Sequence, residues 1–467
     1  MVRALVESLQ SSLQDHKIAL DAFAGIAAAL SAMAAFRLRA RPRMAAWLAV
    51  LSGTVIALAM STDDFLHAWD ERYHAVVARH LALHPFVPTL YEQTPLPMAP
   101  VWGSGHVWIH KPPLPLWLMA ATLRMLGTCE LAIRLPSVLL LALCAYATAR
   151  IGERLLDQSA GLLGGFLVAI NGNLLDLASG RKPTDHVDSI LTSLTCLAVW
   201  SAVEHAARPS RWRAALTGLL AGLAVLSKWL VGLLPFAVWA VLLRRRRERG
   251  SDLLLGLAVC ALVATPWQLY VAAAFPAEAA FEAAHRTRHL FETLDEHLGS
   301  PLFYLIRIPR TFGELSPLAL IFFAWKRKEP ALLIWAALPY AFFSIIATKM
   351  ENYAMPAAPA IALMIAWSAV ELWRARSGWM RVLAAGLLLL PVRYAVERWK
   401  PLRRFDEDRA VARTLRALPS GKVLVVGAKH PIEAMFYGDR AAYAETPDAA
   451  TLARLRGEGW QVVEDGP

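Results

Sequence analysis

The sequence predicts an all-α protein that crosses a membrane many times, with about 12–13 transmembrane helices. Hydrophobic residues make up 57% of the 467-residue chain. Apolar runs of about 15 to 20 residues recur along it, which is the length that a helix needs to cross the hydrocarbon core of a bilayer. These runs are continuous, whereas the strands of an outer-membrane barrel alternate apolar and polar residues.

Twelve apolar runs mark the expected spans, and the runs at 213–226 and 229–243 are short enough to be tilted or joined differently. The twelve lie at 18–36, 44–60, 130–149, 160–178, 189–206, 213–226, 229–243, 252–273, 303–325, 331–347, 354–372 and 379–394. We expect four regions: N-terminal transmembrane helices in 1–60, a first outward loop with interfacial helices in 61–129, a transmembrane bundle in 130–394, and a small α/β segment in 395–467.

The formal net charge of +11 is concentrated in short segments between the spans. Cytoplasmic loops of membrane proteins carry an excess of lysine and arginine, so we assign these segments to the cytoplasm. No separate basic domain exists, which argues against nucleic-acid binding. The segments are RLRARPR (37–43), RPSRWR (208–213), RRRRER (244–249), KRK (326–328) and RARSGWMR (374–381).

This assignment places residues 61–129, 179–188, 274–301 and 348–353, together with the tail after 394, on the extracytoplasmic side. Ten of the thirteen histidines lie in the first three of these loops. Scattered loop residues would not sort to one face in this way. The sequence therefore predicts a single outward-facing site.

The two ends of the chain and the cysteines give weaker signals. The polar stretch of about 17 residues at the N-terminus is unlike a cleavable signal peptide, so the first span is expected to remain. Cys144, Cys196 and Cys260 lie within apolar runs and Cys129 near a surface, so no structural disulfide is expected. In the tail, GKVLVVGA (421–428) and WQVVED (460–465) indicate strands, and PDAATLARLRGEG (447–459) indicates a helix.

The first outward loop contains the stretch DERYHAVVARHL, residues 70–81. Apolar or aromatic residues recur at helical spacing from Glu71 to Leu83, which predicts a helix lying along the membrane surface. Asp70 and Glu71 stand at its amino end. These acids could act chemically, or they could only favour the helix dipole.

A second polar stretch in the same loop is HKPPLPLWL, residues 110–118. Pro112 and Pro113 hold the backbone extended and restrict the residue before them, so Lys111 is fixed near the interface. Such a lysine could extend its ammonium group to lipid headgroups. It is also the point charge that a phosphate-bearing lipid needs.

These motifs resemble those of the GT-C glycosyltransferases that use polyprenyl-phosphate sugars. The nearest branch is that of the bacterial lipid A aminoarabinose transferases, with the protein O-mannosyltransferases more distant. The resemblance covers roughly residues 60 to 375 and is most specific in the first loop. It is carried by DERYHAVVARHL, HKPPLPLWLMA (110–120), GTCELAIRLPS (127–137), Asp185, Lys228 in LSKWLVGLLP, and KMENYAMPAAP (349–359).

The resemblance implies inverting transfer of a sugar, hexosyl or pentosyl, from a lipid-linked phosphate to an acceptor. Asp70 matches the proposed catalytic carboxylate, acting as general base. Lys111 matches the basic residue near the phosphate, with Lys349 as a further candidate for stabilising the leaving anion. The remaining residues expected to bind substrate or phosphate are Glu71, Arg72, Tyr73, His110, Lys228, Arg288 and Tyr353.

The sequence departs from the family at His110, where relatives commonly have glutamate. That glutamate is associated in some relatives with a divalent metal, and imidazole is itself a good zinc ligand. His285 and His289 are four residues apart, which could place them on one helix face. A metal held by His110, His285 and His289 is therefore an expectation, with ordinary surface histidines as the alternative.

The second outward loop, RKPTDHVDS, offers Asp185 and Asp188 as further catalytic carboxylates. Asp185 falls where the family has its second-loop aspartate, although either residue could only cap the following helix. Lys228 is a candidate buried cation, placed at a short outward turn. Glu282, Arg286 and Arg288 could line the same cavity. Tyr353 could contact the lipid carrier or be an interfacial tyrosine.

Two other functions would leave different features in the sequence. A transporter or flippase of lipid-linked intermediates would need ionisable groups or broken helices at the bilayer midplane, whereas the acids here lie in outward loops. A transferase using nucleotide-activated sugars would face the cytoplasm. The sequence thus favours a bacterial inner-membrane enzyme with a periplasmic site and a polyprenyl-phosphate sugar as partner. The acceptor stays open between lipid A, another envelope glycan or lipid, and a protein.

Overall fold

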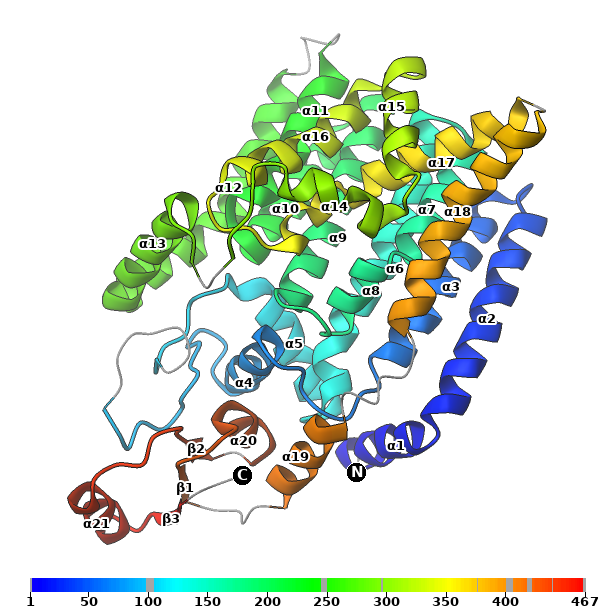
Figure 1. The fold of residues 1–467 in the computed structure, drawn as a ribbon. Coiled ribbons are helices and arrows are strands. Elements are labelled where there is room, and N and C mark those ends of the chain that lie inside the picture. Colours follow the sequence, from blue (N-terminus) through cyan, green and yellow to red (C-terminus); the bar gives the residue numbers. More distant parts are fainter. Residues whose placement is uncertain are drawn as a thin grey trace.

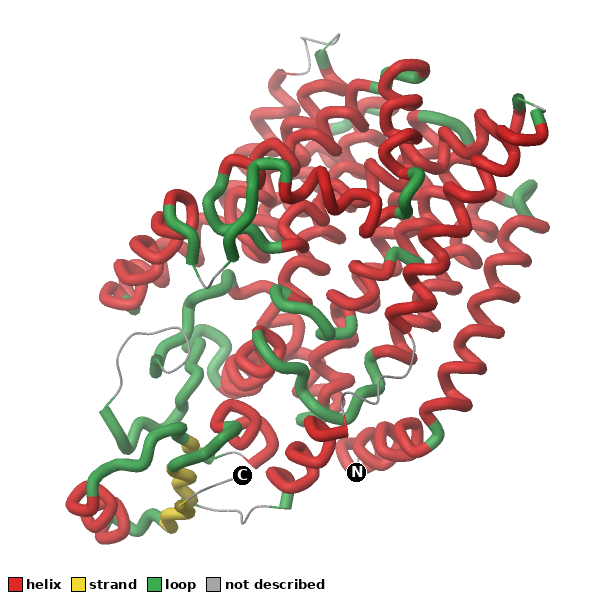
Figure 2. Tube along the Cα trace, in the orientation of Figure 1, coloured by secondary structure: helices red, strands yellow, loops and turns green. Residues whose placement is uncertain are grey.

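The computed structural model describes residues 2–97, 105–244, 250–294, 297–375, 377–399, 406–417, 422–438 and 440–464. Helices dominate it, and a small three-stranded sheet lies near the C-terminus (Figures 1 and 2). The basic segment RRRRER lies outside the described residues except for Arg244. The expected fold class, a polytopic helical membrane protein with a small C-terminal α/β segment, is confirmed.

The N-terminal third contains α1 (Val2–Asp15), α2 (Lys17–Arg37), α3 (Pro42–Met60), α4 (Asp70–Leu83), α5 (Pro113–Leu126) and α6 (Glu130–Leu155). The bundle continues with α7 (Gln158–Ala169), α8 (Gly172–Ala178), α9 (Asp185–Ala207), α10 (Arg211–Lys228), the 3-10 helix η1 (Trp229–Leu233), α11 (Leu234–Leu243), α12 (Gly250–Ala274), α13 (Pro276–Phe291), α14 (Phe303–Phe312), α15 (Ser316–Lys326), α16 (Pro330–Ile345), the 3-10 helix η3 (Glu351–Ala357), α17 (Ala358–Arg374) and α18 (Gly378–Trp399). The C-terminal segment contains α19 (Asp406–Arg416), β1 (Val423–Val426), α20 (Pro431–Gly438), β2 (Ala441–Ala442), α21 (Ala449–Gly457) and β3 (Gln461–Glu464).

By length and composition, eight helical stretches of the described chain can cross a membrane, or nine if the bent pair α7 and α8 is one span. One of the eight, Arg211–Leu243, contains α10, η1 and α11. Lys228 contacts Asp188 at the amino end of α9, whereas Trp239 contacts His205 at the carboxyl end of the same helix. The chain therefore reverses direction after Lys228, which separates the two short apolar runs of the sequence.

The remaining difference from the expected 12–13 spans lies in shorter apolar helices. The run expected at 303–325 is two helices, because Gly313 between α14 and α15 has a φ of 97°, which favours glycine and ends a right-handed helix. α15 and α16 have 11 and 16 residues. Each is too short to pass the length criterion for a straight span.

The basic segments lie together at one end of the bundle. The Arg39 carbonyl accepts from Gln158, and Arg327 donates to the Leu155 carbonyl at 2.8 Å. Arg154 pairs with Glu204, near the basic segment that begins at Arg208. Arg374 lies 3.5 Å from Asp157 in the same region. Four of the five predicted cytoplasmic segments thus share one end, which is the arrangement that the positive-inside rule requires.

The opposite end collects the first outward loop, the 179–184 loop, η3 and the C-terminal segment (Figure 1). Arg181 lies 2.8 Å from Asp63, and Asn352 donates to the Pro183 carbonyl at 3.0 Å. Contacts between these loops come from residues far apart in sequence. Polar side chains from loops far apart in sequence therefore meet at this end, opposite the basic segments.

The C-terminal sheet has the order β2-β1-β3, with both neighbours parallel to β1. β1 is buried, and its residues belong to one apolar cluster with those of α4 and α5. Tyr73 and Val76 are among the α4 members of this cluster. α4 packs between α5 and α20, so its apolar residues contact protein. Its expected place along the membrane surface stays a prediction.

Polar contacts also fasten the C-terminal segment to the bundle. The hydroxyl of Tyr437 donates to Glu130 and accepts from the Leu66 amide, both at 2.8 Å. Arg79 of α4 donates to the carbonyls of Met435 and Phe436. The cysteines are all buried thiols, including Cys129, which was expected near a surface.

Tyr437→Phe is expected to loosen the C-terminal segment. The change leaves the Leu66 amide without its acceptor and removes one of the hydrogen bonds to Glu130, which still pairs with Arg416, at a cost of about 1–3 kcal/mol. Hydrogen–deuterium exchange should rise in β1 and α20. Tyr340→Phe, in the bundle, serves as the matched control and should leave that exchange unchanged. Equal exchange in Tyr437→Phe and the unmodified protein would contradict the anchoring role.

Candidate functional site

Four charged side chains from four separate elements converge at the polar end. Asp70 begins α4, Lys111 precedes α5, Asp188 lies in the first turn of α9, and Lys228 ends α10. Lys111 Nζ lies 3.8 Å from Asp70 Oδ2, and Lys228 Nζ lies 2.5 Å from Asp188 Oδ1. We call these four residues the charged cluster.

The loop between α4 and α5 folds back to bring Lys111 to Asp70. An antiparallel bridge joins Thr89 to Val107, and the Trp108 amide donates to the Pro88 carbonyl at 2.8 Å. Pro112 then has the extended conformation expected of the Pro-Pro pair, with φ −59° and ψ 156°, and α5 begins at Pro113. The backbone thus fixes where the Lys111 side chain starts.

Lys228 reaches the charged cluster because α10 ends abruptly. Trp229, the residue after it, has a φ of 54° and starts the fold-back through η1. The ammonium group lies 4.0 Å from the centre of the Tyr353 ring, a favourable cation–π distance. Asp188 Oδ2 on the other side is buried and has no hydrogen-bond partner among the residues that the structure describes.

Asp70 is held as a charged carboxylate. Burial by itself raises its pKa, but Lys111, His74, the Thr184 amide and Lys228 together outweigh burial and hold the pKa below its ordinary value. The Thr184 N–H donates to Asp70 Oδ2 at 2.8 Å. Asp70 is therefore ionised at neutral pH and has its orientation fixed by the second outward loop.

Glu71, the residue after Asp70, belongs to a buried ion pair that supports the fold. Glu71 accepts two hydrogen bonds from Arg134, at 2.7 and 3.0 Å, and both side chains are fully buried. Burial raises the pKa of Glu71, but Arg134 and His186 outweigh it and hold the pKa well below its ordinary value. Gly180, with a φ of 78°, passes so close that a Cβ there would collide with the carboxylate.

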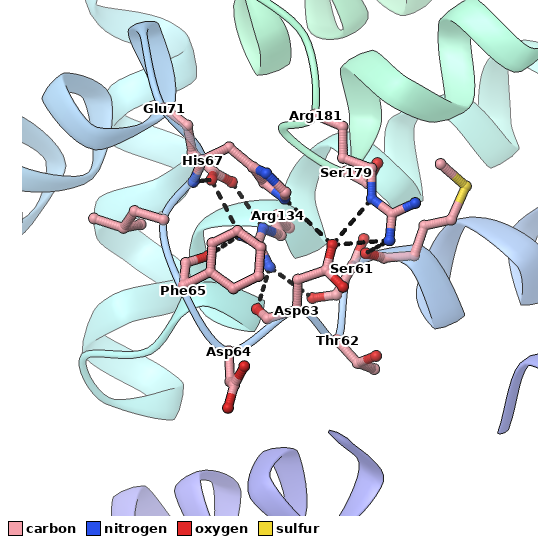
Figure 3. A network of polar contacts seen from close by, with 12 residues as sticks. Ser61, Thr62, Asp63, Asp64, Phe65, His67, Glu71, Arg134, Ser179 and Arg181 are labelled. Carbon is pink, nitrogen blue, oxygen red and sulfur yellow. Dashed lines mark hydrogen bonds and ion pairs between the residues drawn. The ribbon is translucent and has the colours of Figure 1, made fainter. Parts of the chain in front are cut away.

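Arg134 also fixes the loop before α4 (Figure 3). Its guanidinium donates to the carbonyls of Ser61, Asp63 and Phe65 at 3.1, 2.5 and 2.7 Å. A planar five-donor group can satisfy three carbonyls and one carboxylate at once, which a lysine cannot do. The start of α4 is therefore positioned by one residue of α6.

Asp63 completes this network (Figure 3). It lies 2.8 Å from Arg181 and 3.3 Å from His67. Burial raises the pKa of Asp63, but Arg181, His67 and Lys17 outweigh burial and hold it well below its ordinary value. These contacts tie the first outward loop to the 179–184 loop that holds Asp70.

Backbone strain is concentrated around the charged cluster. Of the five non-glycine residues with positive φ in the described chain, four flank it: Trp69 (77°), Thr184 (68°), Asp185 (28°) and Trp229 (54°). Such conformations cost about 1–3 kcal/mol each and persist where the surroundings enforce them, most often at functional sites. The strain here orients Asp70, Asp188 and Lys228.

Other residues expected at the site have different positions. Asp185 is fully buried and lies 2.9 Å from His74 Nδ1, so it orients the face of α4 behind Asp70. Tyr73 lies on α4, while Arg72 pairs with Glu433 at 3.1 Å. Lys349 does not join the charged cluster, because its ammonium group donates to the carbonyls of Phe343, Ser344 and Ile346 at the end of α16.

Arg288 also lies apart. It is exposed and pairs with Glu292 at 2.8 Å on α13. Arg286 on the same helix lies over the Trp229 ring at 4.1 Å, and burial lowers its pKa to about 10. Of these two arginines, Arg286 is the one that contacts the turn after Lys228.

The histidines expected to bind metal lie near one another. His110 pairs with Glu282, His285 Nε2 lies 3.2 Å from His289 Nε2, and the His110 and His285 rings meet edge to face with centroids 6.5 Å apart. Within the described ranges, no group of three or more histidine, cysteine, aspartate or glutamate side chains is arranged to hold a metal ion. The donor types suit zinc, but the arrangement does not fit a closed site, and no chemical step below depends on a metal.

Sequence reasoning missed the residues that support the charged cluster: His74, Arg134, Thr184 and Arg181. One signal was present. An arginine four residues into an apolar run, as Arg134 is, must be paired inside the protein because an unpaired charge there is costly. His74 and Thr184 carry no comparable signal, since their partners depend on the tertiary fold.

Fold and site together define a multi-pass helical membrane protein with a charged cluster at one end of its bundle. Residues 110–270 match the family described as Dolichyl-phosphate-mannose-protein mannosyltransferase. Two curated relatives are 27% identical: undecaprenyl phosphate-alpha-4-amino-4-deoxy-L-arabinose arabinosyl transferase 1 of Pseudomonas fluorescens (strain Pf0-1), over 59% of this chain and 52% of the relative, and the corresponding transferase of Pseudomonas aeruginosa (strain PAO1), over 58% and 52%. The chain spans about half the length of the curated relatives it matches.

Solved structures show the same fold at lower identity. ArnT from Cupriavidus metallidurans bound to undecaprenyl phosphate superimposes with a TM-score of 0.64 over 89% of both chains, at 18% identity. The apo oligosaccharyltransferase of Archaeoglobus fulgidus gives 0.53, at 14% identity, over 85% of this chain and 64% of its own. The GT-C resemblance of the sequence motifs is thereby confirmed at the level of fold.

Acidification is expected to destabilise the protein through Glu71 and Asp63. Because both folded-state pKa values lie below the ordinary 4.5 and 3.8, the stabilisation is complete above those values and is lost as the pH falls below them. Thermal unfolding in detergent should therefore show a melting temperature that falls steeply below about pH 4.5.

Glu71→Gln should lower the melting temperature at neutral pH, because breaking a buried pair costs about 3–5 kcal/mol. It should also flatten the acid dependence. Glu292→Gln, which removes an exposed partner of Arg288, is the control and should change neither property. A Glu71→Gln protein with unchanged stability and acid dependence would contradict the structural role of this pair.

Proposed function

We propose that this chain is a glycosyltransferase that moves a hexosyl or pentosyl group from a polyprenyl-phosphate donor to an acceptor, with inversion, on the extracytoplasmic face. The single observation that carries the proposal is the charged cluster: an ionised carboxylate, Asp70, beside Lys111 and near Lys228. A base and two cations at one point are what this transfer needs.

The transfer of the sugar needs no oxidant or reductant. An acceptor O–H or N–H attacks the anomeric carbon of the sugar, a new C–O or C–N bond forms, and the bond from that carbon to the phosphate oxygen breaks. Asp70 takes the proton from the acceptor as general base. The electron pair of the broken bond leaves with the polyprenyl phosphate.

The lysines supply the stabilisation that replaces a general acid. Lys111 and Lys228 would lie beside the leaving phosphate, where fixed cations stabilise the growing negative charge. Asp188 and the Tyr353 ring hold Lys228 in place. Because phosphate is an adequate leaving group once its charge is compensated, no further acid is needed.

The similar proteins support a lipid-linked donor. The relatives are named for undecaprenyl-phosphate-linked aminoarabinose, and the ArnT neighbour was solved with undecaprenyl phosphate. A donor anchored in the bilayer also accounts for a site built on so many spans. We propose undecaprenyl-phosphate sugar as the donor, the bacterial inner membrane as the location and the periplasm as the side that the site faces. Lipid A, another envelope glycan or lipid, and protein are the acceptor classes.

A divalent metal at His110, His285 and His289 stays a prediction of the sequence. It would act near the charged cluster, because Arg286 on the same helix contacts the turn after Lys228. Elemental analysis of the purified protein tests it: about one equivalent of zinc, reduced in His285→Ala and His110→Ala, would support the metal. His297→Ala, which changes another histidine of the same outward region, is the control. Less than about a tenth of an equivalent of zinc per protein in every sample would contradict this prediction.

Asp70→Asn is expected to abolish transfer while leaving folding intact, because asparagine keeps the shape but cannot accept the proton. Removing a positioned base typically costs about 10²–10⁴-fold in rate. Purified protein in nanodiscs would receive undecaprenyl-phosphate sugar or nucleotide sugar separately, with an envelope-lipid extract as acceptor, and products would be followed by mass spectrometry.

Glu292→Gln removes an exposed carboxylate on the same side and should retain full activity. Near-normal turnover in Asp70→Asn would refute its role as base. Turnover only with nucleotide sugar would refute the lipid-linked donor. Movement of intact lipid-linked sugar across the bilayer without transfer would indicate a flippase instead.

A further inference from the structure

A cavity separate from the charged cluster lies between α4, the first outward loop and the C-terminal segment. Its volume is about 640 Å³, within the range of small-molecule sites. Arg72 and Tyr73 of α4 line one side, Tyr91 of the loop a second, and Lys429, Tyr443 and Glu445 of the C-terminal segment the third. All three parts of the chain are needed to enclose it.

Aromatic rings form the inner wall. The rings of Tyr91 and Tyr443 stack with centroids 4.9 Å apart and an interplanar angle of 28°, which joins the loop to the sheet. Burial raises the pKa of Tyr443 to about 12 and raises that of Tyr73 as well. Both phenols therefore stay protonated at neutral pH and can donate hydrogen bonds. Apolar rings with hydroxyl groups at their edges suit ligands that are themselves both apolar and polar.

The charged groups around the rings have both signs. Lys429 and Glu445 are exposed on the rim. Arg72 pairs with Glu433, yet its Nε and Glu433 Oε2 are buried without hydrogen-bond partners among the described residues. Glu433 itself is not part of the lining, but Arg72, Lys429, Glu445 and Asp448 are, so the cavity offers both donors and acceptors beside its aromatic rings, as a ring bearing many hydroxyl groups requires. A purely anionic ligand would meet Glu445, and a purely apolar one would leave the polar rim unsatisfied.

The cavity is next to the proposed base. Tyr73 follows Asp70 by three residues on α4, so the two side chains are neighbours on one helix face. A ligand held against Tyr73 would therefore lie near Asp70, with the C-terminal segment on its other side. The lipid-linked donor would come from the bundle and the second substrate from the C-terminal segment.

We infer that this cavity binds the saccharide part of the acceptor. That this saccharide is the acceptor rests on the proposed function, but the binding of a saccharide can be measured without any turnover. It gives the C-terminal segment a function: the segment forms one wall of a carbohydrate site and holds it against α4. It also favours a glycan or glycolipid acceptor over an unglycosylated protein.

The test is saturation-transfer NMR on the full chain in nanodiscs, with chitobiose as the saccharide probe and glycerol as the comparison. The unmodified protein should transfer saturation to chitobiose and not to glycerol. The double variant Lys429→Ala, Glu445→Gln should lower the chitobiose signal at least about threefold. Both residues are exposed, so folding should be unaffected.

The matched control is Lys422→Ala, Glu458→Gln, which removes the same two charges from the same segment away from the cavity. It should bind chitobiose as the unmodified protein does. Absence of transfer to chitobiose, or equal transfer in both double variants, would overturn the inference whether or not the protein is a transferase.

With an active preparation, the two substrates can be separated kinetically. The Lys429→Ala, Glu445→Gln protein should have an acceptor KM at least about fivefold higher, with donor KM and kcat unchanged. A raised donor KM with an unchanged acceptor KM would instead place the cavity on the donor side and overturn the inference. Failure of all lipid-linked donors would refute the proposed function and leave the NMR result to decide on the cavity.

Discussion

The polar end of this protein depends on one buried ion pair, Glu71 with Arg134. Two charges removed from water are costly, and the cost is offset here because Arg134 satisfies three backbone carbonyls as well as the carboxylate. The pair fixes α6 against the start of α4. Since Asp70 precedes Glu71, the position of the proposed base follows directly from it. Of the two adjacent acids, Glu71 thus supports the structure, and Asp70 is left for the proposed chemistry.

Charge is balanced differently in the charged cluster. Lys228 and Asp188 form a close pair, whereas Lys111 lies 3.8 Å from Asp70, looser than a direct hydrogen bond. A phosphate that binds Lys111 would therefore not have to break a direct hydrogen bond between Lys111 and Asp70. The left-handed backbone at Trp69, Thr184 and Trp229 shows that the surrounding fold enforces these positions. The site is thus arranged before a substrate binds, which is the condition for electrostatic stabilisation of a leaving group.

The sequence predicted the helical bundle, because each apolar run coincides with one helix or a broken pair, and it predicted the gathering of polar loops at one end. It also selected Asp70, Lys111, Asp188 and Lys228, which the fold brings together. It assigned Glu71 to substrate binding, because the buried pair of Glu71 with Arg134 depends on the tertiary fold. Lys349 was proposed to stabilise the leaving anion, but its ammonium group instead donates to carbonyl groups at the end of α16. The wall that the C-terminal segment builds depends on Tyr91 and Tyr443, which are 352 residues apart and give no shared pattern.

The central claim is that Lys111 and Lys228 form one binding site for a lipid-linked phosphate. Thermal unfolding of the purified protein with and without undecaprenyl phosphate tests it most directly, because a ligand that binds only the folded state raises the melting temperature. We expect undecaprenyl phosphate to stabilise the unmodified protein and the control Lys422→Ala, and this stabilisation to be lost in the double variant Lys111→Met, Lys228→Met. Equal stabilisation of that double variant would contradict it.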